Sequence, residues 1–357
     1  MYTLYVSMAS PYSMKVAALI GYAGLPCELA KQNLVSRFGV IKRLTGKTMV
    51  PVLRDGDWAI SDSTHIARYV MAKSERPTLP RSARLGPLCW LLEEFADEWI
   101  SRWMIYSRWS HLQDTEEVES IVGRELAGNM PILSSILGKQ AGSMVRKKLK
   151  SAGIRPENDA ALQNSRDRCL QVLDALAGTP PLYLFEGYPT VADFAIYGAL
   201  GQFARDRTGR KTLRTLPDLR RYIERIDAMT IPLPLIETMD QPSRDISRLQ
   251  PLFAEFIGTY WPVLVANYRA LAQAKPPSVV RAVLIDGATF SFAPSRYVAG
   301  RFKEILAVLD ETYRRQDHLF GDDGLRLESA LMSNVARLTH YVEGRELLRE
   351  YQHLGMH

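Results

Sequence analysis

The first residues that suggest chemistry are a serine and a proline that follow a short strand-forming run. The stretch 2–7 is typical of a strand, and Ser10 and Pro11 stand just before a helix predicted over residues 14–24. Serine is a favoured N-cap and proline a favoured first helical residue, so the pair can be a helix start and nothing more. The free N–H groups of a helix N-terminus also stabilise a thiolate and lower the pKa of a thiol from about 8.5. The pair therefore predicts either a capped helix or a site that handles sulfur.

Two later stretches have the residue types that bind a peptide-like ligand. Pro51 begins a predicted strand, and a cis bond before it would turn the main chain of Val50 toward an extended ligand; a trans proline on an edge strand is the alternative. Asp62 and Ser63 begin another predicted helix and suit an N-cap. They equally suit a site where N–H groups and the Ser63 hydroxyl hold a carboxylate while Asp62 pairs with an ammonium group.

A small α/β unit must position these residues. Alternating and helical patterns predict a βαβα unit followed by ββα, with a mixed sheet, within residues 1–75. The strands are predicted at 2–7, 27–34, 50–53 and 58–60, and the helices at 14–24, 35–44 and 62–72. A polar segment with two prolines, residues 75–84, is predicted to be a linker.

The rest of the chain is predicted to be mostly helical. Residues 85–236 read as an all-α domain, and residues 237–357 as a third region that contains a β-hairpin at 279–292. The helices of the all-α domain are predicted at 85–109, 115–137, 140–152, 157–177, 191–206 and 217–229. Those of the third region are predicted at 251–274, 302–314 and 325–351.

Four motifs in this order carry a resemblance to a known family. They are Ser-Pro-Tyr-Ser at 10–13, Val-Pro-Val-Leu at 50–53, Ser-Asp-Ser at 61–63 and the stretch 187–194. Over residues 1–236 the chain resembles the glutathione transferase family, with its thioredoxin-like N-terminal domain and all-α C-terminal domain. In the fourth motif Thr190 and the acid three residues later suit a capping box, which concerns folding rather than chemistry.

The resemblance implies glutathione as a co-substrate, no metal, and roles for particular residues. Ser10 matches the catalytic Ser or Cys position, and Ser13, one turn on, is a second candidate for the thiolate donor. The implied glutathione contacts are Lys47, Val50, cis-Pro51, Asp62 and Ser63. His65 stands where the family often has a small residue, and we expect it to be a packed core histidine.

A serine at position 10 excludes one class of glutathione-dependent reaction from those expected. Members with Cys there form a mixed disulfide with glutathione, which a hydroxyl cannot do, so thiol transfer is not expected. We expect a glutathione-dependent transferase or lyase that activates the thiolate toward a hydrophobic electrophile. The alternative is a non-catalytic binding or scaffold protein on the same fold, because fold alone does not fix function.

The second substrate is expected between the two domains, beside an aromatic-rich helix at residues 97–109. One face of this helix reads as core, through Trp99 and Trp103. The other face can line a pocket with a cation for an acidic or aromatic substrate. The candidate substrate contacts are Tyr12, Arg102, Tyr106 and Trp109.

Composition sets the remaining expectations. The 357 residues carry a net charge of +6, three dispersed cysteines and no histidine metal signature. The N-terminus lacks a signal-peptide pattern, so we expect a cytoplasmic protein without disulfides or membrane spans. The basic stretch 146–150 reads as a solvated helix face rather than a nucleic-acid site.

The family is usually dimeric, so a homodimer is possible. The region 237–357 resembles the extension of some long bacterial members, and it can cap the pocket, affect dimerisation or bind a partner.

Overall fold

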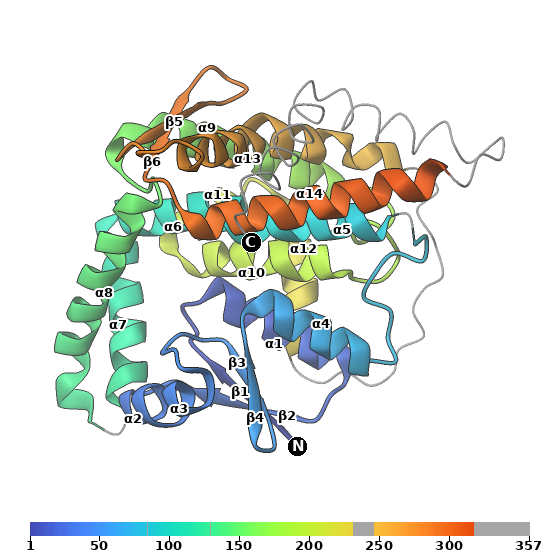
Figure 1. The fold of residues 1–357 in the computed structure, drawn as a ribbon. Helices are drawn as coiled ribbons and strands as arrows, with labels where there is room; N and C mark the ends of the chain where they lie inside the picture. The colour runs from blue at the N-terminus through green and yellow to red at the C-terminus, as the bar shows by residue number, and fades with distance from the viewer. Residues whose placement is uncertain (84, 129, 231–245, 318–357) are drawn as a thin grey trace.

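The structure is a computed structural model that describes residues 1–83, 85–128, 130–230 and 246–317, with side chains described up to residue 307. The α/β unit, helical bundle and β-hairpin expected from the sequence are all present (Figure 1). The helix predicted at 325–351 lies outside the described residues.

The N-terminal unit is a four-stranded mixed sheet with helices on both faces. Its strands are β1 (Tyr2–Val6), β2 (Cys27–Lys31), β3 (Val52–Asp55) and β4 (Trp58–Ser61), in the order β2-β1-β3-β4. β1 runs parallel to β2 and antiparallel to β3. Side chains alternate between faces along a strand, so Leu4 and Val6 of β1 face the main core while Tyr5 faces a small cluster with Ile41.

Helices α1 (Pro11–Ala23) and α4 (Ser63–Lys73) cover the sheet face that looks toward the helical part of the chain (Figure 1). A helical connection covers the other face, made of α2 (Leu34–Ser36), η1 (Arg37–Ile41) and α3 (Lys42–Thr45). The two domains meet where α1 packs on α10 (Val191–Arg205). A Cβ atom at Gly198 of α10 would lie 2.6 Å from the carbonyl oxygen of Pro11, so this close approach requires glycine.

The helical part is built around two long buried elements. The first is a continuous helix of α5 (Gly86–Phe95), η2 (Ala96–Ile100) and α6 (Ser101–Ser110), and the second is α10. Helices α9 (Asp159–Ala177), α11 (Arg207–Leu213) and α12 (Pro217–Asp227) pack around them. The predicted capping box is confirmed: Asp193 Oδ2 accepts hydrogen bonds from the Thr190 backbone N–H at 2.8 Å and the Thr190 hydroxyl at 2.6 Å.

A helical hairpin of α7 (Leu112–Ala127) and α8 (Ser134–Ser151) corrects one predicted boundary. The sequence pattern predicts helices at 115–137 and 140–152, but α7 ends at Gly128, whose φ is 56°, and the next helical turn starts at Pro131. Glycine in the left-handed region ends a helix, and proline begins one. Apolar periodicity continued across this break, which is why the prediction missed it.

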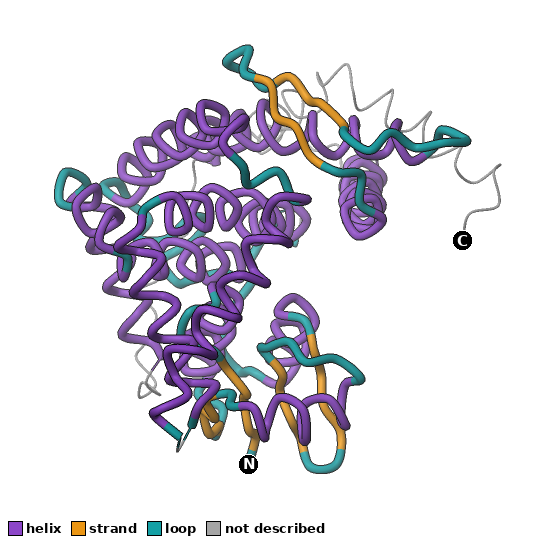
Figure 2. Tube along the Cα trace, turned by 90° about the vertical axis from the view of Figure 1, so that its left-hand side faces the viewer, coloured by secondary structure: helices purple, strands orange, loops and turns teal. Residues whose placement is uncertain are grey.

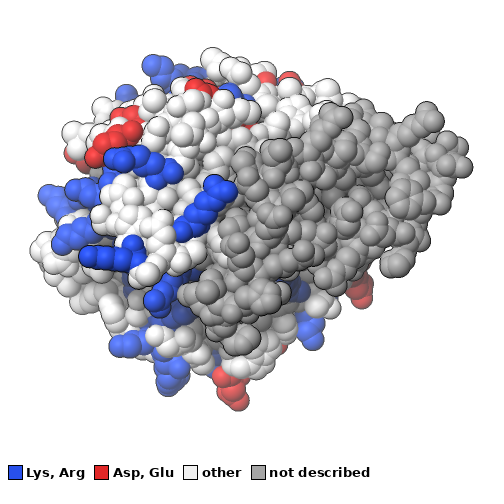
Figure 3. All heavy atoms as spheres, turned by 45° about the horizontal axis from the view of Figure 1, so that its top comes forward, with Lys and Arg blue, Asp and Glu red and all other residues white. Residues whose placement is uncertain are grey.

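The basic stretch on α8 is a solvated helix face, as predicted. The side chains of Arg146, Lys147, Lys148 and Lys150 are exposed. Figure 3 shows Lys and Arg side chains gathered toward the left of that view, the side on which α7 and α8 lie in Figure 1.

The third region packs directly onto the helical part. It comprises η6 (Ile246–Leu249), α13 (Gln250–Leu271), β5 (Val280–Val283), β6 (Thr289–Phe292) and α14 (Arg296–Asp317). Figures 1 and 2 place the β5–β6 hairpin, α13 and α14 at the end of the molecule opposite the sheet. Aromatic rings join the regions: Phe95 lies 5.7 Å from Phe256, and Trp99 lies 5.1 Å from Phe290, measured between ring centroids. These residues belong to one continuous core.

Two simpler expectations can be compared with the fold. The thiols of Cys27, Cys89 and Cys169 are all free. None of the helices in the described ranges combines the length and apolar character needed to cross a membrane.

Candidate functional site

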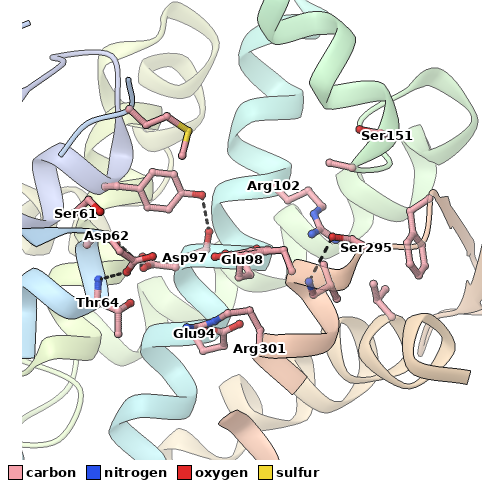
Figure 4. Close-up of a pocket in the computed structure, with 18 of the residues that line it drawn as sticks. Ser61, Asp62, Thr64, Glu94, Asp97, Glu98, Arg102, Ser151, Ser295 and Arg301 are labelled. Carbon is pink, nitrogen blue, oxygen red and sulfur yellow. Dashed lines mark hydrogen bonds and ion pairs between the residues drawn. The ribbon is translucent and has the colours of Figure 1, made fainter. Parts of the chain in front are cut away.

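A cavity of about 640 Å³ lies where three parts of the chain meet (Figure 4). One wall comes from the α/β unit, a second from α5, η2 and α6, and a third from β6, α14 and the loop between them. Its volume lies within the range of ligand pockets in proteins. Of the predicted site residues, the cavity brings together Tyr12, Lys47, Val50, Pro51, Asp62, Ser63 and Arg102.

Four predicted site residues do not line this cavity. Ser10 caps α1, with its Oγ accepting a hydrogen bond from the Ser13 backbone N–H at 3.3 Å. Ser13 is buried, and its Oγ accepts a hydrogen bond from the backbone N–H of Ser7 at 3.2 Å. Tyr106 is buried in the core, and Trp109 lies under the guanidinium of an arginine on α8. The roles assigned to these four residues stay predictions.

The first feature of the cavity that suits a peptide ligand is the segment before β3. The Val50–Pro51 peptide bond is cis, which decides between the two alternatives that the sequence left open. The sheet ladder begins only at Val52, so the main chain of Val50 lies outside it while lining the cavity. Main-chain groups in this position can form β-type pairs with an extended peptide.

The second feature is the N-terminus of α4. Asp62 is its N-cap, with Oδ1 accepting hydrogen bonds from the backbone N–H groups of Thr64 at 3.0 Å and His65 at 3.4 Å. Within the described residues, Oδ2 of Asp62 has no hydrogen bond, so it can accept one from a ligand. The φ of Asp62 is 86°, a conformation that costs about 1–3 kcal/mol for a non-glycine residue and often marks a functional position. His65 is exposed, so its predicted core position is wrong: its side chain lies on the outer side of α4.

Below this helix start lies a buried cluster of charges. The ammonium of Lys15, 0% exposed, lies 2.7 Å from Asp97 Oδ2 and 2.5 Å from Glu93 Oε1. The hydroxyls of Ser63 and Thr64 donate to the same two carboxylates, at 3.3 and 2.6 Å respectively. The cluster therefore ties α1 and α4 to the long helix of the second domain.

The pKa values in this cluster follow from burial and pairing. Burial alone would lower the pKa of Lys15, but Asp97 and Glu93 outweigh that effect and raise it above its ordinary value. Burial raises the pKa of Asp97 to about 7, although Lys15 opposes the shift. A carboxyl group on the cavity wall therefore changes its charge near neutral pH.

The loop before α1 is held by residues of the helical part. The carboxylate of Glu125 accepts hydrogen bonds from the Ser7 hydroxyl at 2.7 Å and the Met8 backbone N–H at 2.6 Å. The buried guanidinium of Arg108 donates to the Ala9 carbonyl at 3.0 Å and is paired with Asp206 at 2.8 Å. These contacts fix the position of Ser10, which follows directly.

Three polar contacts fasten the third region to the cavity wall. The guanidinium of Arg301 pairs with the buried carboxylate of Glu94, whose other oxygen accepts from the Tyr260 hydroxyl at 3.0 Å. The Tyr297 hydroxyl donates to Glu98 Oε1 at 2.8 Å. The sequence left open whether this region caps the pocket, affects dimerisation or binds a partner. In the structure its residues form one wall of the pocket.

Comparisons with known proteins agree with this architecture. The model of the glutathione S-transferase N-terminal domain matches residues 4–78, and that of the glutathione S-transferase C-terminal domain matches residues 159–225. These two segments of the chain thus match the N-terminal and C-terminal domains of the glutathione S-transferase family. Helices α5 to α8 and the region after α12 lie outside both matches.

Similar solved structures share low sequence identity with the chain. A GST-like protein from Pseudomonas syringae is 14% identical, with a TM-score of 0.45 over 64% of this chain and 66% of that one. The beta-etherase LigF from Sphingobium is 16% identical, with a TM-score of 0.43 over 64% and 95%. Human glutathione transferase theta-2, in complex with glutathione, is 17% identical, with a TM-score of 0.42 over 64% and 82%. No curated protein matches the sequence. The two domain matches support a glutathione-binding, transferase-like function.

The residues that hold the site together were not predicted from the sequence. Lys15 lies far from Glu93 and Asp97 in the chain, and no local motif connects it to them. One signal was present: four acids at positions 93, 94, 97 and 98 interrupt an otherwise apolar helix. Acids on a buried helix face need partners, so this pattern indicates a buried network. Glu125 and Arg108 gave no comparable signal.

Proposed function

We propose that this protein is a glutathione-dependent transferase or lyase, and that glutathione binds as an extended peptide along the α/β wall of the cavity. The observation that carries the proposal is the open wall where Val50, cis-Pro51 and the N-terminus of α4 face one cavity. Val50 would pair with the cysteinyl main chain of glutathione. Ser63 and the α4 N–H groups would hold the γ-glutamyl carboxylate, and Asp62 Oδ2 its ammonium group. Lys47 would lie near the glycyl end.

The proposed chemistry is activation of the glutathione thiol by the start of α1. Ser10 Oγ uses a lone pair to accept the Ser13 N–H, and this leaves its proton free to donate to a thiolate. The thiolate attacks an electrophilic carbon of the second substrate. A sulfur–carbon bond forms, and the leaving group departs with the electron pair of the bond that breaks. The rate gain comes from a larger thiolate fraction and from positioning.

The proposal assigns a role to each part of the chain. Residues 1–75 bind glutathione, residues 85–236 are the helical domain, and residues 292–301, within the region 237–357, contribute the third wall of the cavity. The second substrate is a small hydrophobic molecule that reaches the thiolate through this cavity, because apolar residues of the third wall, including Phe292 and Val298, line it.

One observation favours the second candidate, a non-catalytic glutathione-binding or scaffold protein. Tyr12 lines the cavity, whereas Ser10 does not. The Tyr12 hydroxyl donates to the backbone carbonyl of Asp97 at 3.2 Å, and burial raises its pKa above the ordinary value, so it stays a neutral donor. If Tyr12 occupies the space that the thiol needs, glutathione would bind without being activated.

Calorimetric titration with reduced glutathione tests both candidates. We expect wild-type protein to bind and Asp62→Ala to lose at least tenfold in affinity. Asp62→Asn is the matched control, because asparagine is an equally good N-cap but lacks the charge. A loss in both variants assigns the effect to the charge; a loss in Asp62→Ala alone assigns it to the helix cap.

The ultraviolet absorbance of bound thiolate, titrated with pH, then tests activation. For a transferase, the bound thiol has a lowered pKa in wild-type protein and an ordinary pKa in Ser10→Ala. Tyr12→Phe serves as the comparison, and a shift lost only in that variant would transfer the role to Tyr12. An ordinary thiol pKa in the wild type supports the scaffold instead. Absence of any heat with millimolar glutathione contradicts the transferase and favours a scaffold that does not bind glutathione.

A further inference from the structure

The cavity contains a buried cation without a partner, at the end formed by the third region. Arg102 is 8% exposed and lines the cavity. Its guanidinium lies over the rings of Trp99 and Phe290, 5.5 and 5.6 Å from their centroids. It forms no ion pair or hydrogen bond with any residue in the described ranges, although Glu98 lies one helical turn away.

Stacking against aromatic rings does not satisfy an arginine. The rings contact the faces of the planar guanidinium, while its five N–H groups point outward in the plane and need acceptors. Buried charges in proteins are normally paired, because an unpaired one loses its hydration without compensation. Since both rings are fully buried, the open side of the Arg102 guanidinium is the cavity.

The acidic residues that α5 and η2 place on the cavity wall already have polar partners. Asp97 pairs with Lys15, Glu94 pairs with Arg301, and Glu98 accepts a hydrogen bond from Tyr297. Among the residues that the structure describes, Arg102 is thus a buried cation of this wall that has no charged partner. Its charge is available to a ligand.

A second donor, held in a fixed position, lines the same cavity. Figure 4 shows Ser295 and Arg102 among the residues of its wall. Asn267, which is fully buried, holds the backbone of Ser295 from both sides: its Oδ1 accepts from the Ser295 N–H at 2.7 Å, and its Nδ2 donates to the Ser295 carbonyl at 2.9 Å. The Ser295 Oγ accepts a hydrogen bond from Val298 N–H at 3.4 Å, so its proton can be donated to a ligand.

We infer that Arg102 and Ser295 form an anion subsite that selects second substrates bearing a carboxylate on an apolar or aromatic body. The fork of N–H groups matches a planar carboxylate in a bidentate pair. Apolar residues from the third region, such as Phe292 and Val298, line the same end of the cavity and suit the hydrophobic body. The inference rests on the proposed function, because the second substrate is defined by its reaction with glutathione. Arg102, Phe290 and Ser295 all lie outside the two family matches.

A matched pair of glutathione conjugates tests the inference. S-(4-carboxybenzyl)glutathione and S-benzylglutathione differ only in the carboxylate. We expect wild-type protein to bind the carboxylate conjugate about 10- to 100-fold more tightly, the usual range for hydrogen bonds to charged groups. Arg102→Met, which keeps an apolar stem, should remove this preference while binding S-benzylglutathione as the wild type does. Arg102→Lys should keep part of it.

Controls separate this subsite from its neighbours. Arg68→Met removes another guanidinium that lies over a ring, 5.0 Å from the centroid of Trp90, but outside the cavity, and should leave the preference unchanged. Equal affinity of wild-type protein for the two conjugates overturns the inference. So does a loss of affinity for glutathione itself in Arg102→Met, because the arginine would then belong to the glutathione site.

A probe without glutathione keeps the two proposals apart. If neither conjugate binds, the proposed function has failed, and thermal melting with 4-isopropylbenzoate and 4-isopropylbenzyl alcohol tests the subsite alone. Stabilisation by the benzoate but not the alcohol, lost in Arg102→Met, supports the subsite. Equal shifts with the two compounds, or no shift with either, overturn it.

Discussion

We predict that Lys15→Met destabilises the protein by about 3–5 kcal/mol at pH 8, because it leaves two buried carboxylates without a cation. Methionine preserves the apolar stem of the lysine, so packing against the neighbouring helices changes little. Lys15 itself is 0% exposed, and its ammonium contacts Glu93 and Asp97 at 2.5 and 2.7 Å. If only the stem mattered, the substitution would cost less than about 1 kcal/mol.

The direction of the Asp97 pKa shift determines how this loss of stability depends on pH. Burial already holds the pKa of Asp97 at about 7, above its ordinary value, and removing Lys15 removes the effect that opposes burial. In the variant the pKa of Asp97 therefore lies above 7, so above about pH 7 its folded state keeps a proton that the unfolded chain and the folded wild type have released. Over that window the free energy of unfolding falls with rising pH more steeply in the variant than in the wild type. The loss relative to wild type is therefore smaller at pH 5.5 than at pH 8.

Urea denaturation followed by tryptophan fluorescence at both pH values measures these effects. Lys139→Met, at an exposed position on α8, is the matched control and should change stability by less than about 0.5 kcal/mol. Replacing all three charges, with Glu93→Gln and Asp97→Asn added to Lys15→Met, should recover most of the loss. A loss below about 1 kcal/mol at pH 8, or one that is equal at the two pH values, would refute the reasoning.

Three further substitutions test the packing and the polar contacts. Gly198→Ala places a Cβ 2.6 Å from a backbone oxygen of α1. It should reduce the free energy of unfolding by about 1–3 kcal/mol, measured by melting, and weaken glutathione binding, measured by calorimetry. Gly39→Ala is its control, because a Cβ there meets nothing within 4 Å. Asp193→Ala removes the acceptor of the capping box and should cost about 3 kcal/mol in urea denaturation; a loss below about 1 kcal/mol would contradict this role. Arg301→Met leaves Glu94 buried without its cation, so we expect the free energy of unfolding to fall by about 3–5 kcal/mol. Adding Glu94→Gln to the same chain should reduce this loss. An unchanged loss in the double variant would show that the ion pair is not responsible.

Local patterns predicted the parts of the fold that local physics determines. The caps at Ser10 and Asp62, the capping box at Thr190 and the hairpin around residue 286 each depend on residues a few positions apart, and each was predicted. The four motifs together predicted the two-domain architecture, because their order and spacing are specific to one superfamily. The break between α7 and α8 was missed, because apolar periodicity outweighed the glycine at 128.

The interior of the site could not be predicted in the same way. Lys15 and Asp97 are separated by 82 residues, and Tyr297 and Glu98 by 199, so their pairing depends on how whole helices pack. The sequence identified Arg102 as a cation on an aromatic helix, but Phe290 completes its surroundings from the other end of the chain. The pairing of side chains at a domain interface depends on tertiary packing, which the spacing of residues in the sequence does not reveal.

The shared core between the third region and the helical part affects how the protein folds during synthesis. The apolar face of the helix that carries Phe95 and Trp99 is completed by Phe256, Tyr260 and Phe290, more than 150 residues later. At the usual 5–20 residues per second, the ribosome needs about 10–40 s to extend the chain from Trp99 to Phe290. Throughout that interval the nascent chain exposes an aromatic surface that chaperones recognise. A chain truncated after α12 would keep that surface exposed permanently, so the third region cannot be removed as an independent module.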